Sequence, residues 1–320
     1  MRLFSNALYV ADEQLDRDAL AGAFALVRQH QAQLTIIDVI PEPSHSEVAA
    51  FGEGGKYELL ARRQAARAAK LRELTVELED GEQIGIVQRV GRRYLEAIKT
   101  VMAQGFDLVI KRAERPAWLD RLFTSDDMHL LRKCPCPVYL IHPDTPEQPR
   151  VLAAIDLDPD EEPDRRDAIN RRILDFASAA AAFEDAELHI AHAWESPVAG
   201  FAALWTDMPE EAEHRYSEGE YTLRKDLMDA TVSRLRQSVA EETFAFLAPQ
   251  SRLLQGRAEV RIPEFAHQLG VSVVVMGTVA RSGIPGLIIG NTAEDILQQL
   301  RCSILAIKPA GFESPVRAAE

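Results

Sequence analysis

The residue types best suited to chemistry lie in the stretch VVVMGTVARSGIPGLIIGNTAEDI, residues 273–296. Gly277 follows an apolar run, and a glycine after a strand lets the backbone approach a ligand and turn its N–H groups, at positive φ, toward an anion. Gly290 precedes a helix-like segment whose expected cap is Asn291 or Thr292, and the free amides of a helix N-terminus also attract anions. The stretch therefore predicts either a phosphate-binding site or a tight turn.

Catalytic motifs are missing from the sequence. Neither the P-loop pattern G-x-x-x-x-G-K-[ST] nor G-x-G-x-x-G follows the apolar run. The chain also lacks G-x-S-x-G, H-E-x-x-H and S-x-x-K, which mark common hydrolase sites. The sequence therefore indicates a binding loop and identifies no general base or nucleophile.

The elements that must position this loop occur twice along the chain. Residues 6–12 match residues 150–156, and residues 136–143 match residues 302–309, at offsets of 144 and 166 residues. Short Val/Ile/Leu runs alternate with longer helical segments in each half, which predicts two α/β domains with parallel sheets covered on both faces. The expected strands are 7–10, 34–40, 84–90, 108–110 and 138–141, then 151–155, 188–194, 252–254, 273–276 and 304–307.

The two halves differ in length. We expect a first domain over residues 1–143 and a second over residues 150–310, joined by the Pro-rich linker HPDTPEQP. The second half has 22 more residues in its middle, from the difference between the two offsets. They fall largely in residues 196–221, which we interpret as a lid or a partner-binding surface.

Charge argues against nucleic acid as a partner. The chain carries 50 acidic and 36 basic side chains, a net charge of −14, whereas a protein that binds phosphate backbones needs a basic surface. Residues 1–149 hold 19 basic and 22 acidic side chains and residues 150–320 hold 17 and 28, a net charge of −3 against −11. The more acidic half is the one with the glycine-rich stretch.

Two groups of residues resemble metal ligands. The acidic residues in 156–164 are spaced as in a calcium loop, but the sharp-turn glycine of an EF-hand is absent, and helix capping by these acids is the simpler interpretation. His189 and His192 lie three residues apart on an expected strand, so their side chains point to opposite faces. We therefore predict no metal site made by the protein alone.

Cysteine usage and hydropathy indicate the compartment. Cys134, Cys136 and Cys302 are too few for a disulfide framework, and we interpret them as small buried residues, with a redox role for the Cys-Pro-Cys segment as the alternative. No apolar run approaches the ~20 residues of a membrane helix, and the N-terminus lacks the apolar region of a signal peptide. We expect a cytoplasmic protein that has no membrane partner.

One motif carries a family resemblance. The pattern Gly277-x-x-Ala280, nine residues, then Gly290-Asn291 resembles the ATP-binding motif of the universal stress protein family, Gly-x-x-Gly, nine residues, Gly-Ser/Thr. The strand that ends in Asp156 and the closing CSILAIKP also fit, and the resemblance covers the whole chain as two tandem copies, most like the E-type bacterial members. Two positions depart from the motif, because Ala280 replaces a glycine and Asn291 replaces a hydroxyl residue.

The resemblance implies a fold, a ligand and a pairing. Each domain would be doubly wound, with a five-stranded parallel sheet of order 3-2-1-4-5 and helices on both faces. The second domain would bind ATP or a related adenine nucleotide, alone or with Mg²⁺. The two domains would pair as an intramolecular pseudo-dimer, and the sequence leaves open whether whole chains also form a homodimer. The implied nucleotide-binding residues are Asp156, Ala193, Gly277, Ala280, Gly290, Asn291 and Thr292.

The first half has lost the glycines of this motif. At an offset of 166 residues, Lys111 replaces Gly277 and Thr124 replaces Gly290. Side chains at these positions would fill the space where the backbone must meet phosphate, so we expect a degenerate nucleotide site in the first domain. The alternative is that Lys111, with Arg112 and Arg115, recognises a different anion.

The expected function is therefore that of a tandem universal stress protein, a nucleotide-binding module of the stress response. Enzyme activity is uncertain and would amount to slow ATP hydrolysis at most, because no residue is placed as a base. Two alternatives remain open. One is an enzyme or binder that acts on another nucleotide-containing metabolite, and the other is a scaffold that binds no nucleotide.

Overall fold

The computed structural model describes residues 3–51, 55–76, 78, 84–113, 124–143, 146–196, 209–279 and 289–317. The chain divides into two compact units, residues 1–143 with 312–320 and residues 144–311. We refer to these units as domain 1 and domain 2. The segment after Gly311 belongs to domain 1, a feature that the repeat pattern did not predict.

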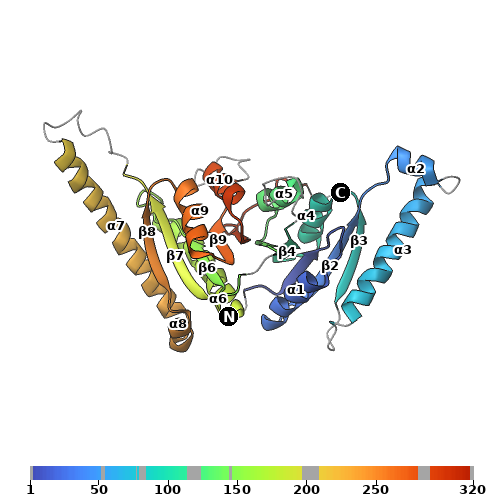
Figure 1. The fold of residues 1–320 in the computed structure, drawn as a ribbon, viewed down its shortest axis with the longest axis horizontal. Helices are drawn as coiled ribbons and strands as arrows, with labels where there is room; N and C mark the ends of the chain where they lie inside the picture. The colour runs from blue at the N-terminus through green and yellow to red at the C-terminus, as the bar shows by residue number, and fades with distance from the viewer. Residues whose placement is uncertain are drawn as a thin grey trace. The chain divides into compact units, whose positions relative to one another are not determined.

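Domain 1 alternates strands and helices around one parallel sheet (Figure 1). The strand order is β3-β2-β1-β4-β5, which confirms the predicted order 3-2-1-4-5. The elements are β1 (Asn6–Val10), α1 (Arg17–Gln29), β2 (Gln33–Ile40), α2 (His45–Phe51), α3 (Gly55–Val76), β3 (Gly85–Val90), α4 (Arg93–Gln104), β4 (Leu108–Arg112), α5 (Ser125–Lys133) and β5 (Val138–Ile141).

Domain 2 repeats this architecture with the parallel order β8-β7-β6-β9-β10. The α/β class and the five strands expected in each half are therefore confirmed (Figure 1). The elements are β6 (Arg150–Ala154), α6 (Pro163–Glu184), β7 (Glu187–Trp194), α7 (Pro209–Ser238), α8 (Glu241–Leu247), β8 (Gln250–Gln255), α9 (Ala258–Leu269), β9 (Val273–Gly277), α10 (Asn291–Gln299) and β10 (Ser303–Ile307).

The core of each domain follows from the continuous apolar strands. Every residue of β10 is buried, and in β1 only the first residue is not, as expected for strands with helices on both faces. The helices before β4 and β9 end at equivalent glycines, Gly105 at φ 70° and Gly270 at φ 61°. Because this left-handed conformation suits glycine, each helix stops where the next central strand must begin.

The extra residues of the second half form helix rather than loop. Residues 209–221 belong to α7, which has 30 residues where α3 has 22, and the interpretation of residues 196–221 as a lid or a partner-binding surface stays a prediction. Residues 197–208 lie outside the described residues. The short helix α8 follows α7 and has no counterpart among the described residues of domain 1.

Candidate functional site

The carboxyl ends of β6 and β9 lie side by side in domain 2. These neighbouring strands continue toward opposite edges of the sheet, and ligands of doubly wound sheets bind where the order reverses in this way. Ala154 at the end of β6 pairs with Met276, Gly277 is the last residue of β9, and Asp156 lies two residues beyond β6. The structure therefore brings Asp156 and Gly277 to one edge of the sheet.

Helix α10 begins at this edge without a capping side chain. Its N-cap is Gly290 rather than Asn291 or Thr292, which corrects the predicted cap, and this residue provides no side-chain cap hydrogen bond. The Gly290 N–H donates to the Thr278 C=O at 3.0 Å. Asn291 and Thr292 are exposed. Gly290 is buried, and the first-turn amides of α10 carry the positive end of the helix dipole.

Neither glycine adopts a backbone conformation that requires glycine. Gly290 has φ −75°, and Gly277 also lies outside the positive-φ region, so the expected positive φ was wrong. An ideal Cβ on Gly277 would meet Ile169 Cγ1 at 3.6 Å and Ile173 Cδ1 at 3.7 Å, which is ordinary contact. What these residues offer is a backbone without a side chain, which a closely approaching ligand would need.

Asp156 is held by α6. Its N–H donates to Asn170 Oδ1 at 3.0 Å and its C=O accepts from Asn170 Nδ2 at 2.6 Å. Its own Oδ1 accepts from the Asp158 N–H at 3.2 Å. Glu162 caps α6 by accepting from the Arg165 N–H, as predicted for the acids of this loop. Asn170 has no sequence signal, because it lies 14 residues from Asp156 within a helical pattern.

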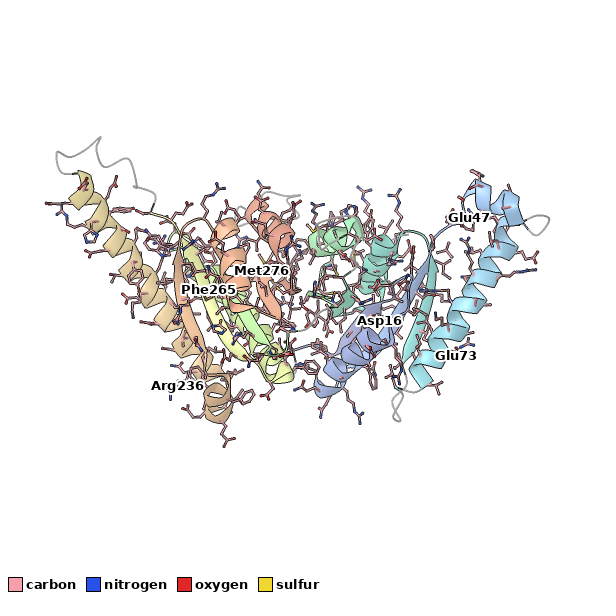
Figure 2. All side chains as sticks on the ribbon, viewed as in Figure 1. Asp16, Glu47, Glu73, Arg236, Phe265 and Met276 are labelled. Carbon is pink, nitrogen blue, oxygen red and sulfur yellow. The ribbon has the colours of Figure 1, made fainter. Side chains whose placement is uncertain are left out.

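The residues of β7 separate onto two faces as predicted. His189 lies against Phe265 of α9, labelled in Figure 2, with ring centroids 6.5 Å apart. His192 lies on the other face, where its Nδ1 is 3.2 Å from the Leu157 N and 3.9 Å from Asp156 Oδ1. Ala193 is half-buried near the carboxyl end of the strand. His192 therefore contributes to the Asp156 loop, while His189 does not.

The pairing of the strands identifies the residue of domain 1 that is equivalent to Gly277, and it is not the residue predicted. Val10 pairs with Lys111 in domain 1 and Ala154 pairs with Met276 in domain 2, and Val10 and Ala154 are equivalent positions. Lys111 is therefore the counterpart of Met276, and Arg112 is the counterpart of Gly277. The assignment of Lys111 to the place of Gly277 was wrong by one residue, because the loop between β4 and α5 is one residue shorter than the loop between β9 and α10.

Lys111 forms a buried ion cluster in domain 1. Its side chain is 0% exposed, and its Nζ lies 3.1 Å from Asp12 Oδ1 and 2.9 Å from Asp127 Oδ1. Asp127 also closes a capping box with Thr124, the N-cap of α5. In domain 2, Met276 stands for Lys111 and Ala293 stands for Asp127, so the equivalent positions there cannot form this cluster.

Lys111 and Arg112, the last two residues of β4, are paired with acids of domain 1. Lys111 is buried, and Arg112 Nη1 lies 3.0 Å from Asp16 Oδ2. A second ion pair of the same domain joins α3 to the buried Asp38: Arg67 donates from Nη2 to Asp38 Oδ1 at 2.6 Å and to the Asp12 C=O at 2.8 Å. No sequence pattern indicated this pair. Arg115 lies outside the described residues.

Part of the predicted site also lies outside the described residues, namely Ala280 and the loop up to residue 288. Around it the structure reveals a buried lysine that sequence reasoning missed. Lys308 follows β10, is 0% exposed, and donates to Thr278 Oγ1 at 2.8 Å. Thr278 directly follows Gly277, so Lys308 fixes the start of the glycine-rich loop.

The cysteines are buried, as predicted. Cys134 and Cys136 bring their sulfurs to 3.6 Å, and burial raises the pKa of Cys302 to about 12. The hydrogen bond to Cys134 and burial raise the pKa of Cys136 as well. Thiols with raised pKa values are poor nucleophiles, which favours packing over chemistry.

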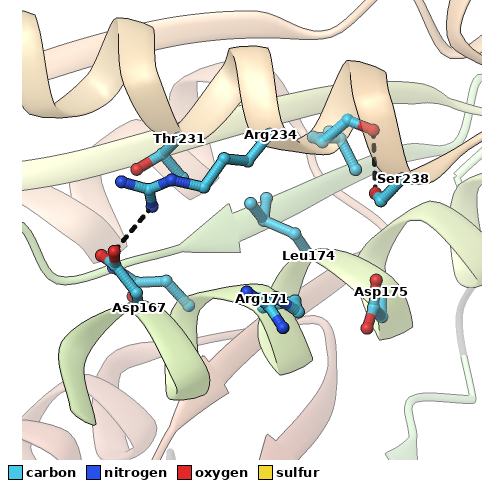
Figure 3. A pocket seen from close by; sticks show the side chains of 9 residues that line it. Asp167, Arg171, Leu174, Asp175, Thr231, Arg234 and Ser238 are labelled. Atoms are coloured by element: carbon cyan, nitrogen blue, oxygen red, sulfur yellow. Dashed lines mark hydrogen bonds and ion pairs between the residues drawn. The ribbon is translucent and has the colours of Figure 1, made fainter. Parts of the chain in front are cut away.

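A small cavity lies between α6 and α7 (Figure 3). Its volume is about 30 Å³, which is room for water and not for a nucleotide. Arg234 of α7 reaches Asp167 of α6 at 3.0 Å across it, and burial raises the pKa of Asp175. The cavity is a gap in helix packing, and the residues that line it are Asp167, Asn170, Arg171, Leu174, Asp175, Thr231, Arg234, Leu235 and Ser238.

Comparison with known proteins decides the family. The model of the universal stress protein family matches the chain twice, over residues 5–142 and 150–308. The chain belongs to the universal stress protein family. The two matches make it a tandem member, as the motif and the repeat predicted.

Several relatives resemble the chain over its full length. Universal stress protein E of Salmonella typhi is 30% identical over 99% of this chain and 98% of its own. Universal stress protein E of Photorhabdus laumondii is 27% identical over 100% of both chains. A crystal structure of a functionally unknown protein from Pseudomonas aeruginosa PAO1 has 26% identity and a TM-score of 0.66, covering 96% of this chain and 93% of the other.

A more distant structure shares the fold. A universal stress protein from Archaeoglobus fulgidus has 14% identity and a TM-score of 0.60, covering 95% of this chain and 98% of its own. Within the described residues, no helix combines the length and the apolar composition that crossing a membrane requires.

Proposed function

We propose that domain 2 binds ATP or a related adenine nucleotide, alone or with Mg²⁺, and that domain 1 binds none. The protein would then be a binding module of the stress response, acting in the cytoplasm. The observation that carries this proposal is the contrast between two equivalent helices. The N-terminus of α5 is closed by the Thr124–Asp127 capping box, whereas α10 begins at Gly290 with no capping side chain.

The surroundings of the equivalent aspartates, Asp12 and Asp156, also support a ligand in domain 2 and none in domain 1. The Asp12 side chain is 9% exposed and paired with Lys111, whereas the Asp156 side chain is 33% exposed and oriented by α6. A phosphate at α10 and an adenosine near Asp156 and Ala193 would span the carboxyl edge of the sheet in domain 2. In domain 1 the same edge is occupied by the ion cluster of Lys111, Asp12 and Asp127. The pairing of the two domains, or of two chains, stays a prediction.

Calorimetry with ATP tests the proposal. We expect one site per chain and no binding by Gly290→Val, because a branched side chain at the N-cap would block the approach of phosphate to the α10 amides. Thr124→Val is the matched control, since it alters the equivalent N-cap of domain 1. It should cost about 1 kcal/mol of stability through the lost cap and leave nucleotide affinity unchanged. Two sites per chain, or normal binding by Gly290→Val, would refute the proposal.

A further inference from the structure

Both peptide groups of Asp156 depend on one side chain. Asn170 accepts from the Asp156 N–H at 3.0 Å and donates to the Asp156 C=O at 2.6 Å, and it is buried on α6. One turn earlier on the same helix, Arg166 donates from Nη1 to the Asp158 C=O at 3.2 Å. The segment after β6 is therefore tied to α6 at two points.

This clamp sets the direction of the Asp156 carboxylate. Its Oδ1 is engaged by the Asp158 N–H at 3.2 Å, and a third of the side chain stays exposed at the carboxyl edge of the sheet. A carboxylate that is already oriented loses less conformational entropy when a ligand binds than one that must be ordered. The clamp thus presents a hydrogen-bond acceptor at a defined position.

Domain 1 demonstrates that the fold itself does not need the clamp. The buried face of α1 has no polar side chain. Its members are Leu20, Ala23, Phe24, Leu26 and Val27. An equivalent strand and helix form there, joined by the shorter loop 11–16 where domain 2 has 155–162, and Asp12 pairs with Lys111 instead. The buried amide of Asn170 occurs in the domain whose aspartate, Asp156, is partly exposed, and this favours a role for Asn170 in how Asp156 is used over a role in folding.

We infer that Asn170 is a positioning residue of the proposed nucleotide site and acts through Asp156. It holds the carboxylate toward hydrogen-bond donors of the adenosine, either the exocyclic amine of the base or a ribose hydroxyl. This inference rests on the proposed function. Because a carboxylate accepts hydrogen bonds and does not donate them, the clamp favours ligands that carry a donor at that place.

The test is calorimetry with ATP, ITP and 2′-deoxy-ATP on the wild type, Asn170→Ala, Asp156→Ala and the double variant. Asn170→Ala should weaken ATP binding about tenfold. If the donor is the exocyclic amine, Asn170→Ala should weaken the binding of ITP much less than that of ATP. If the donor is the 2′-hydroxyl, the smaller loss should be seen with 2′-deoxy-ATP. An equal loss for all three nucleotides assigns the 3′-hydroxyl only if the effects of Asn170→Ala and Asp156→Ala are not additive in the double variant. In the Asp156→Ala background, Asn170→Ala should have no further effect.

Ser178→Ala is the matched control. Ser178 is buried two turns farther along α6, and its Oγ has no hydrogen-bond partner within the described chain. Its affinity for ATP should equal that of the wild type. If Asn170→Ala fails to fold, as judged by thermal unfolding, Asn170→Ser replaces it with a smaller polar side chain and the same expectations.

The outcomes separate the two proposals. A wild type that binds none of the nucleotides overturns the proposed function itself. A wild type that binds ATP, with a variant at Asn170 that binds it within twofold of the wild type, overturns the role of Asn170 alone. That role is also overturned if the variant loses affinity equally with and without the Asp156 carboxylate.

Discussion

Lys111→Met should lower the free energy of unfolding of domain 1 more than any surface substitution does. The ammonium lies 3.1 Å and 2.9 Å from two carboxylate oxygens, and at an effective dielectric constant of about 20 each such pair has a gross attraction of about 5 kcal/mol. Much of that attraction offsets the cost of taking the charges out of water. Removing one partner leaves buried charge uncompensated, and we expect a loss of about 3–5 kcal/mol in the free energy of unfolding.

Urea denaturation followed by circular dichroism measures this loss, and hydrogen exchange read by mass spectrometry assigns it to domain 1. Lys99→Met is the matched control, because Lys99 is 30% exposed and its pair with Glu96 should contribute less than about 0.5 kcal/mol. Adding Asp127→Asn to Lys111→Met removes one stranded charge and should recover part of the loss. A loss below about 1 kcal/mol, or no recovery in the double variant, would refute the reasoning.

Three further outcomes follow. ATP should bind more tightly with Mg²⁺ than with EDTA, because a cation offsets repulsion between the phosphates and the acids of residues 156–164; equal affinity by calorimetry would contradict this. Cys302 and Cys136 should resist a thiol reagent in the native protein at pH 8 and react in urea, because burial raises the pKa of Cys302, and the hydrogen bond with Cys134 together with burial raises the pKa of Cys136; rapid labelling of the native protein would contradict this. Burial lowers the pKa of His189 and favours its neutral form, so its contribution to stability is present above pH ~6.5 and lost as the pH falls through the lowered pKa; denaturation midpoints from pH 7 to pH 5 should fall less in His189→Gln than in the wild type.

The central strands could be predicted because their residues are continuously apolar, whereas the edge strands β3 and β8 contain only short apolar runs between polar residues. The glycine-rich stretch could be placed at the carboxyl edge for the same reason. The counterpart of Gly277 could not, since loops of unequal length shift an alignment by one residue and no apolar pattern records that shift. Only the pairing of Val10 with Lys111 reveals it.

The polar contacts of the site were beyond sequence reasoning. Asn170 belongs to a helix whose period places it on the buried face, and nothing in that period says that its amide reaches back to Asp156. The pair of Arg67 with Asp38 joins residues 29 positions apart. Such contacts depend on the direction of side chains across a packed interface, which hydropathy does not encode.

The Lys111 cluster also constrains how the two copies could have diverged after duplication. Lysine at position 111 without its carboxylates would have buried a lone charge, so it could hardly have appeared first. Asp127 is tolerable alone, because as the third residue of α5 it caps the helix. The order aspartate first and lysine second is therefore the accessible mutational path. Once Lys111 and Asp127 are both present, reverting either one alone lowers the stability of domain 1. Single substitutions would therefore not restore a ligand site in this domain.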